Sequence, residues 1–260
     1  MTEPEVCQLW QAIRDRSYAA EQVTGVRYVQ NLENHGIKSG GSLRHPHSQV
    51  LGLPYVPTAQ RRRLQLALEF YKTKNECIFD HLAQHSRCAA GDRSIYEDEH
   101  VVGFVPWSVE RSYEMWLVPR TSGARIGDAS DTVINAVAKS VSHCLRLLYL
   151  QADDPDYNVI VRQAPVTVEK EDSATFDLWY RWHVVIIPST NSWGGVMAVG
   201  DFVCTSATPE EMAERLRSQR GKPLPMPGEL KSRSFWNGRL YLIAIAAAGI
   251  FAFSLHRSMK

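Results

Sequence analysis

The chain has 260 residues, a formal net charge of +1 and 44% hydrophobic residues. This length is enough to bury a core in one large domain or two modest ones. The near-neutral charge gives no reason to expect a nucleic acid or an acidic partner. The five cysteines are scattered and odd in number, so they do not indicate a disulfide framework; they favour a reducing compartment or cysteines with little redox role.

The first elements along the chain are a helix and then two strands. Apolar residues recur at helical spacing between residues 5 and 22, and Thr2 with Glu5 forms a candidate capping box. Strands are expected at 26–32 and 50–56, on either side of a glycine-rich stretch. The segment therefore predicts a helix packed against two antiparallel strands.

The stretch from residue 34 to residue 49 carries the chemistry of the chain. His45 and His47 lie two residues apart, so on a strand both side chains leave the same face. Asn34, Gly40 and neighbouring glycines lie upstream, where small residues and free N–H groups let a phosphate approach the backbone. Two interpretations stay open: a phosphate cradle facing a nucleophilic histidine, or a glycine-rich hairpin with two surface histidines.

The segment 26–36, followed by Gly41-Ser42-Leu43 and His45-Pro46-His47-Ser48-Gln49, resembles the active-site segment of the galactose-1-phosphate uridylyltransferase family, in the histidine-triad superfamily. Weaker similarities follow in the family's order, up to about residue 217. They are Pro106-Trp107, Tyr113 to Arg120, Asp156-Tyr157-Asn158, Trp182-His183 through Pro188, Gly194-Gly195 and Pro209-Glu210-Glu211.

The resemblance implies a role for each residue of the motif. His47 would attack the α-phosphorus of a nucleotide sugar and hold the nucleotidyl group, and Gln49 would hydrogen-bond the phosphoryl oxygens. The remaining implied roles are a phosphate cradle of Asn34, Gly40 and Ser42, and a zinc ligand, His45.

The chain also departs from the family. Relatives carry a longer first domain that supplies further strands, much of the base pocket and a Cys-x-x-Cys pair for zinc, so we expect a truncated first domain with an exposed sheet edge. Cys77 and Asp80 occupy the place of a second Cys-x-x-Cys. With His81, His85 and Cys88 they could hold zinc, although a helix brings together only residues three or four apart.

The rest of the globular part predicts alternating helices and strands. Arg61-Arg62-Arg63 opens a helix expected to run to residue 84, and this cluster is either a solvated first turn or a contact for a phosphate or partner. His183, on a later strand, is more often a structural residue than a ligand. Further strands are expected at 101–105, 115–118, 158–161, 175–187 and 194–203, and capped helices at 131–150 (Ser130) and 209–219 (Thr208).

The tail differs in composition from the rest. Residues 221–238 read as a Pro/Gly-containing linker, and residues 240–255 contain no charge. We interpret 239–256 as one C-terminal transmembrane helix, with a buried core helix as the alternative. The acidic start of the chain resembles neither a secretory signal nor a presequence.

Together these features predict an α+β fold of histidine-triad-like antiparallel sheets with packed helices. The expected parts are a truncated first domain (1–60), a second domain (61–220), the linker and the anchor. We favour an accessory subunit, catalytically degenerate, of a membrane complex, with a mitochondrial membrane preferred. The alternative is a tail-anchored nucleotidyltransferase that acts on nucleotide sugars through His47. Zinc is the one cofactor that these residues suggest.

Overall fold

The computed structural model describes residues 1–43, 45–88, 91–121, 123–166, 175–190, 205 and 207–225, with the backbone of 242–247 and 251–254. Its helices are α1 (Glu3–Glu21), α2 (Thr58–Lys74), α3 (Ile78–Gln84), α4 (Asp131–Ala152), α6 (Phe176–Trp179) and α8 (Pro209–Arg217), with 3-10 turns η1 (Ile37–Ser39) and η2 (Ile126–Asp128). Its strands are β1 (Tyr28–His35), β2 (His47–Leu53), β3 (Arg87–Cys88), β4 (Gly91–Asp92), β5 (Ser94–Glu97), β6 (Val101–Phe104), β7 (Met115–Pro119), β8 (Tyr157–Arg162), β9 (His183–Pro188), β10 (Leu242–Ala247) and β11 (Phe251–Ser254).

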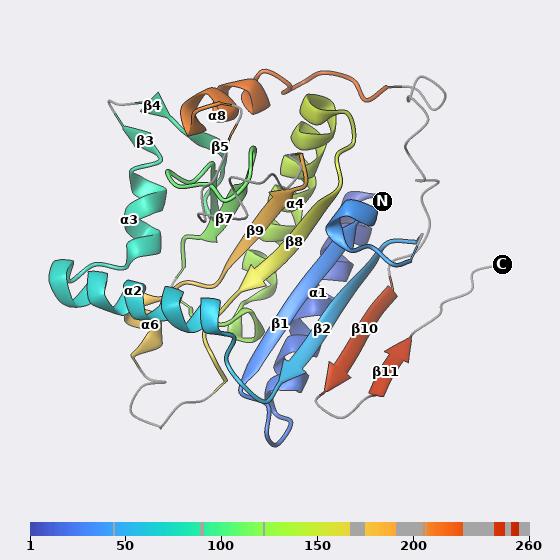
Figure 1. Cartoon of the computed structure of the whole chain (residues 1–260), viewed down its shortest axis with the longest axis vertical. Helices are drawn as coiled ribbons and strands as arrows, with labels where there is room; N and C mark the ends of the chain where they lie inside the picture. Colours follow the sequence, from blue (N-terminus) through green and yellow to red (C-terminus); the bar gives the residue numbers. More distant parts are fainter. Residues whose placement is uncertain are drawn as a thin grey trace, which may run out of the picture.

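Nine of the described strands form one large sheet with helices on both faces, and β3 and β4 form a separate two-stranded sheet (Figure 1). The order of the large sheet is β11-β10-β2-β1-β8-β9-β7-β6-β5, and the pairs from β2 to β5 are antiparallel, which confirms the predicted α+β class. The predicted domains 1–60 and 61–220 both contribute to this sheet, which joins them through the β1–β8 pair. The helix and two strands predicted at the start are confirmed as α1, β1 and β2.

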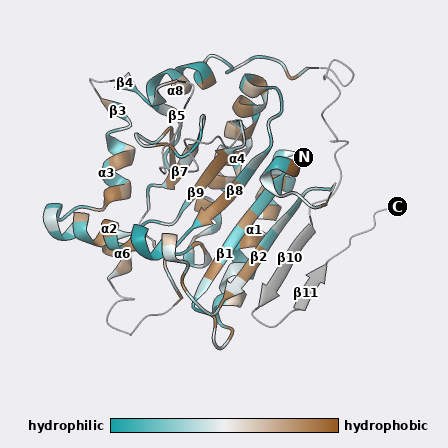
Figure 2. Cartoon of the chain, in the orientation of Figure 1, coloured by the Kyte–Doolittle hydropathy of each residue, from teal (hydrophilic) through white to brown (hydrophobic). Residues whose placement is uncertain are grey.

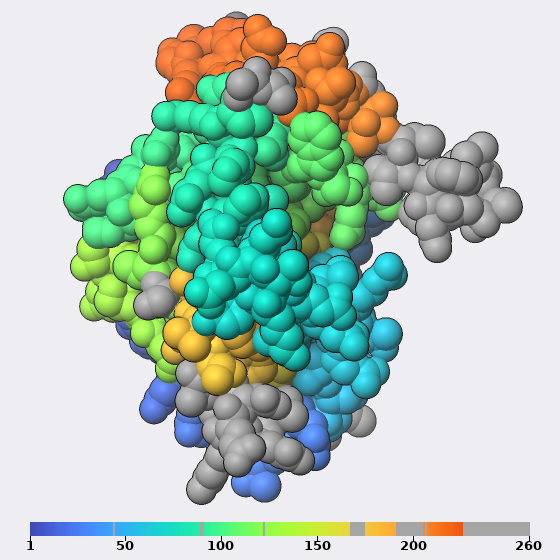
Figure 3. Space-filling view, turned by 90° about the vertical axis from the view of Figure 1, so that its left-hand side faces the viewer, coloured from blue at the N-terminus to red at the C-terminus, as the bar shows by residue number. Residues whose placement is uncertain are grey.

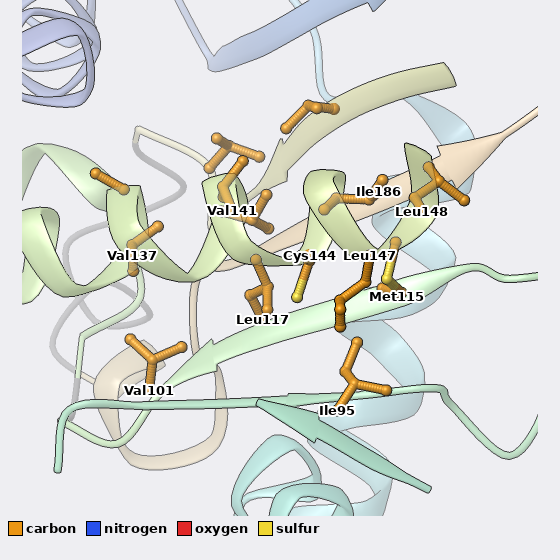
Figure 4. Packing of buried hydrophobic residues seen from close by; sticks show 14 of the residues in the cluster. Ile95, Val101, Met115, Leu117, Val137, Val141, Cys144, Leu147, Leu148 and Ile186 are labelled. Atoms are coloured by element: carbon orange, nitrogen blue, oxygen red, sulfur yellow. The ribbon is translucent and has the colours of Figure 1, made fainter. Parts of the chain in front are cut away.

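Helices α1 and α4 lie on one face of the sheet and enclose the larger core. Met115, Leu117 and Ile186 point from the sheet toward Cys144 and Leu147 of α4, and all five side chains are fully buried (Figure 4). Figure 2 shows the corresponding hydropathy, with β8, β9 and part of α4 strongly hydrophobic. This apolar stripe, repeated at helical spacing, anchors α4 against the sheet because each buried side chain contributes about 1.5–3 kcal/mol.

Helices α2, α3 and α6 cover the other face only in part. Their core, which includes Phe79 and Tyr180, packs on β6 and β7. Figure 3, which looks at the molecule from the side of α2 and α3, shows these helices covering that side, with α8 above them. The same face of β1 and β2 lies beside them and is not covered by a helix (Figure 1).

Local sequence signals place the helix ends well. The backbone N–H of Thr2 donates to Glu5 Oε2 at 2.7 Å, and Thr208 and Glu211 form a reciprocal capping box. Ser130 Oγ accepts from Val133 N at 3.4 Å at the start of α4. These three predicted helices are confirmed because their start signals involve only residues three positions apart.

Two predicted elements differ from the structure. The single helix expected over 61–84 is two helices, α2 and α3, because Asn75 adopts a left-handed conformation with φ 54° and ends the first of them. The strand expected over 175–187 begins only at His183, since 176–179 forms the short helix α6. The strand expected over 194–203 lies outside the described residues.

The predicted transmembrane helix is wrong. Within 239–256 the described residues form strands β10 and β11, and β10 pairs in parallel with β2, with Leu242 opposite His47. Among the residues that the structure describes, no helix is both long and apolar enough to cross a membrane. A short uncharged run rich in Ile and Phe is compatible with a strand as well as a helix, and periodicity alone does not separate the two.

A buried carboxyl group near the end of α1 makes stability depend on pH. Glu21 is 7% exposed, its Oε2 lies 3.9 Å from Arg125 Nε, and burial raises its pKa from 4.5 to about 7. The folded state therefore binds this proton more tightly, and its contribution to stability, complete below about pH 4.5, is lost as the pH rises through 7.

We therefore expect Glu21→Gln to raise the free energy of unfolding by about 2 kcal/mol at pH 8 and to leave it nearly unchanged at pH 4.5. Urea unfolding at the two pH values measures this difference. Glu69→Gln, at an exposed position on α2, is the control and should show no such dependence. An equal effect of Glu21→Gln at both pH values would contradict the prediction.

Candidate active site

The β1–β2 hairpin places the motif residues on the open face of the sheet. Leu32 pairs with Gln49 and Glu33 with Ser48, so the next positions, Asn34 and His47, lie opposite each other. Side chains alternate along each strand, and Asn31 points to the opposite face, where its Oδ1 accepts from Ser17 of α1. The hairpin therefore turns Asn34, His47 and Gln49 away from α1.

His47 is held in one tautomer by the backbone. Its Nδ1 lies 3.2 Å from the carbonyl oxygen of His45, which can only accept a hydrogen bond, so the ring proton is on Nδ1. Nε2 then carries the lone pair, and the Gln49 amide donates to it at 3.3 Å. The imidazole is 3% exposed. This arrangement presents a neutral, nucleophilic Nε2 with a hydrogen-bond donor beside it.

The turn between the two strands is built from glycines and one 3-10 turn. Gly40 has φ 82°, and its N–H donates to Ile37 O, while the N–H of Gly41 donates to Gly36 O at 2.8 Å. These two predicted donors are therefore used within the turn. The groups left for a phosphate are the Asn34 amide and the exposed Ser42 hydroxyl, so Gly40 contributes conformation rather than a hydrogen bond.

Two residues that lie more than a hundred positions later in the chain hold this turn. Asn158 Nδ2 donates to Asn34 Oδ1 at 2.7 Å and to Ser39 O at 2.8 Å. Asp156 Oδ2 accepts from the N–H of Lys38 at 2.6 Å. Because its oxygen is occupied, Asn34 presents its Nδ2 donor toward Gly40, where an added Cβ would lie 3.8 Å away.

Sequence reasoning missed the role of Asp156 and Asn158. Both lie in a segment recognised only as a weak second-domain similarity, and the pairing of Asn34 with Asn158 spans 124 residues. Their signal in the sequence is two short polar side chains at alternate positions entering a strand, which alone does not indicate a partner.

For the nucleotidyl transfer that the sequence resemblance implies, we expect Asn158→Leu to reduce the rate about tenfold to a hundredfold, because Asn34 loses the partner that orients its amide. The rate of covalent labelling from a nucleotide sugar measures this. Asn135→Leu removes a comparable amide, which pairs with Gln11 on the surface of α4, and serves as the control. Wild-type labelling in the Asn158 variant would show that Asn34 needs no such support.

The residues predicted to bind metal are separated or otherwise engaged. Asp80 Oδ2 accepts from Arg181 Nη2 at 2.7 Å, and burial raises the pKa of the Cys77 thiol. His45 is exposed, with its ring centroid 6.0 Å from that of His47. The described part of the chain contains no group of three His, Cys, Asp or Glu side chains able to hold a metal. These residues do not fit a zinc site, and no step of the reaction proposed for this site uses one.

His183 lies on the same sheet face but inside the second core. Its Nδ1 donates to Arg181 O at 2.9 Å, and its ring stacks on Trp116 with centroids 5.1 Å apart. Burial, followed by the charge of Arg162, lowers its pKa to about 3. This neutral, enclosed ring matches the structural role expected for it.

Comparison with known proteins agrees with this geometry. Residues 1–57 match the family described as "Galactose-1-phosphate uridyl transferase, N-terminal domain". ADP-glucose phosphorylase of Arabidopsis thaliana is 23% identical over 208 residues, which are 79% of this chain and 56% of that protein. Galactose-1-phosphate uridylyltransferase of Thermotoga maritima is 24% identical over 209 residues, covering 78% and 64%.

Solved structures agree on the fold. A uridylyltransferase structure superimposes with a TM-score of 0.75 at 22% identity, covering 84% of this chain and 68% of that one. The Arabidopsis thaliana ADP-glucose phosphorylase with bound ADP-glucose gives 0.72 at 21%, covering 84% and 67%. In sequence and in fold, the chain is similar to the galactose-1-phosphate uridylyltransferase family. This uridylyltransferase-like chain spans 56% and 64% of the length of the two curated relatives.

The predicted accessory role in a membrane complex is wrong for this uridylyltransferase-like protein, and so is the predicted membrane localisation. The named relatives are enzymes, and the described residues contain no helix able to cross a membrane.

Proposed function

We propose that this chain binds a nucleotide sugar and transfers its nucleotidyl group through His47. The observation that carries the proposal is the tautomer of His47, since its Nδ1–H is bound to a backbone carbonyl and its Nε2 lone pair is directed at Gln49. The named relatives, an ADP-glucose phosphorylase and a uridylyltransferase, support a nucleotide sugar as the substrate class.

The first half-reaction follows from these contacts. The Nε2 lone pair attacks the α-phosphorus, a P–N bond forms, and the P–O bond to the sugar phosphate breaks, which releases sugar 1-phosphate. The Gln49 amide, which donates to Nε2 in the free protein, then has its N–H available for a phosphoryl oxygen. The backbone carbonyl of His45 stabilises the positive charge that develops on the ring.

The second half-reaction reverses the first with another acceptor. A phosphate oxygen of the acceptor attacks the phosphorus, the P–N bond breaks, and its electron pair returns to Nε2. Asn34 Nδ2 and the Ser42 hydroxyl lie at the turn beside His47 and would bind the neighbouring phosphate in both steps. A sugar phosphate as acceptor makes the chain a transferase, and inorganic phosphate makes it a phosphorylase.

Covalent labelling tests the proposal. The purified chain is incubated with UDP-glucose or ADP-glucose labelled at the α-phosphorus, and protein-bound label and free glucose 1-phosphate are measured. We expect equal amounts of the two, with a protein bond that is labile in acid and stable in alkali, as a phosphorus–nitrogen bond should be. Absence of both label and glucose 1-phosphate with each nucleotide sugar would refute the proposal.

A further inference from the structure

The open face of the sheet extends well beyond His47. The register places Asn34 opposite Asn158 and Leu32 opposite Ile160, and these four side chains are all half-buried. Gln30, two residues before Leu32 on β1, is also half-buried. Because side chains two residues apart share a face, this surface is a shallow floor of polar and aliphatic groups that continues from His47 along β8.

Arg162 ends this floor, and its side chain has no hydrogen bond to any residue that the structure describes. It is 6% exposed, and its guanidinium lies over the Trp116 ring, with Cζ 5.5 Å from the ring centroid. The closest carboxylate, on Glu110, is 3.7 Å from Nη2, beyond hydrogen-bond range. A guanidinium with five donors costs several kcal/mol to bury unless acceptors satisfy it. An acceptor is therefore expected from outside the part of the chain that the structure describes.

A second guanidinium is directed at the same place. Of the three arginines at the start of α2, Arg61 and Arg62 are exposed, and only Arg63 is partly buried. Arg63 Nη2 lies 3.0 Å from Glu110 Oε1, so the same carboxylate oxygen lies near both Arg63 and Arg162. Glu110 is 56% exposed, and such a pair contributes little to stability.

The other titratable groups that face this pair are Glu114, His183 and Tyr180, and the Glu114 carboxyl group stabilises the charge of Arg162. Glu114 accepts from Trp116 Nε1 at 2.7 Å and from the N–H of Glu110 at 2.6 Å, and burial raises the pKa of its carboxyl group. His183, opposite Arg162 on β9, is neutral, and its Nε2 has no hydrogen-bond partner among the described residues. With the Glu114 oxygens engaged and His183 neutral, the two guanidiniums share the exposed Glu110 carboxylate among the described residues, and this arrangement favours an anion over a metal cation.

We propose that Arg63 and Arg162 form an anion subsite that binds a carboxylate or a phosphate carried by the sugar of the substrate. This inference rests on the proposed function. His47 and Arg162 share a face, two strand spacings and four residues apart, which is on the order of 15 Å between backbones. The diphosphate and the sugar of the substrate span that gap, because the side chains of His47 and Arg162 extend toward it from the two ends. A guanidinium binds either a carboxylate or a phosphate with two parallel hydrogen bonds.

The first test compares charged and neutral sugars in the labelling reaction. UDP-glucuronate and UDP-glucose, both labelled at the α-phosphorus, are supplied to the wild type, Arg63→Gln, Arg162→Gln and Arg61→Gln. We expect the wild type to react about tenfold or more faster with the charged sugar per unit concentration, and both site variants to lose that preference. Arg61→Gln, on the exposed side of the same helix, should keep it. A preference unchanged by Arg63→Gln would overturn the subsite.

The second test separates failure of the subsite from failure of the proposed function and distinguishes the two anions. In His47→Ala protein, binding of glucuronate, glucose 6-phosphate and glucose is measured by ligand-observed NMR. We expect one or both anions to bind more tightly than glucose and to lose this advantage when Arg63→Gln is added. Binding that depends on Arg63 without any labelling of the wild type would retain the subsite and refute the transferase. Binding lost with Asn34→Ala but kept with Arg63→Gln would overturn the subsite.

Discussion

Replacement of His47 by alanine should abolish covalent labelling, with a loss of roughly four orders of magnitude. The reason is that Nε2 is the only protein atom that forms a bond to phosphorus in the proposed reaction. Gln49 lies beside it at 3.3 Å but has no lone pair of comparable nucleophilicity. Incorporation of label from the nucleotide sugar, measured over a range of protein concentrations, quantifies the loss.

Two control variants make this result specific. His85→Ala removes an exposed histidine at the end of α3, and it should label at the wild-type rate. His45→Ala removes the exposed side chain but keeps the backbone carbonyl that holds His47 Nδ1, so we expect a loss of less than about tenfold. If His45→Ala were as inactive as His47→Ala, the imidazole of His45 would have a chemical role that this geometry does not contain.

Gly36→Ala should unfold the glycine-containing turn between β1 and β2 and remove most of the labelling. Gly36 has φ 81° and ψ 163°, a conformation that is essentially limited to glycine and costs about 1–3 kcal/mol for other residues. An added Cβ would also lie 2.2 Å from Asp156 Cγ, so the carboxylate that binds Lys38 N would have to move. We expect a loss of about 3 kcal/mol in stability and about a hundredfold in labelling rate.

Gly25→Ala is the matched control for this prediction. Gly25 has φ 89°, but no atom lies within 4 Å of the position that an added Cβ would take, so the substitution introduces backbone strain without a clash. It should cost about 1–2 kcal/mol in urea unfolding and leave the labelling rate of the folded protein unchanged. Equal losses of stability and of labelling rate in the two variants would show that the contact with Asp156 does not contribute to this turn.

The corrections to the sequence-based interpretation have physical causes. Residues 240–255 contain no charge, and this pattern is shared by membrane helices and by buried strands, so composition could not separate them. The metal role of Cys77 and Asp80 stays a prediction that relies on the place of the two residues in the chain, and the structure adds that Asp80 pairs with Arg181, 101 residues away. In each case, the partner that decides the structure is distant in sequence.

The sequence by itself determined the parts of this protein that depend on near neighbours. The two-residue spacing of His47 and Gln49 on β2 placed their side chains together, and His45, just before the strand, placed its carbonyl beside His47. Start signals such as Ser130 set the helix ends, because all these contacts span two to three residues. Only the tertiary structure decided which side chains complete the site. Asp156 and Asn158 hold the phosphate turn, and Arg162 ends the open face, because the register of β1 on β8 brings together residues more than a hundred positions apart. That register follows from the burial of a whole sheet face, which no local spacing records.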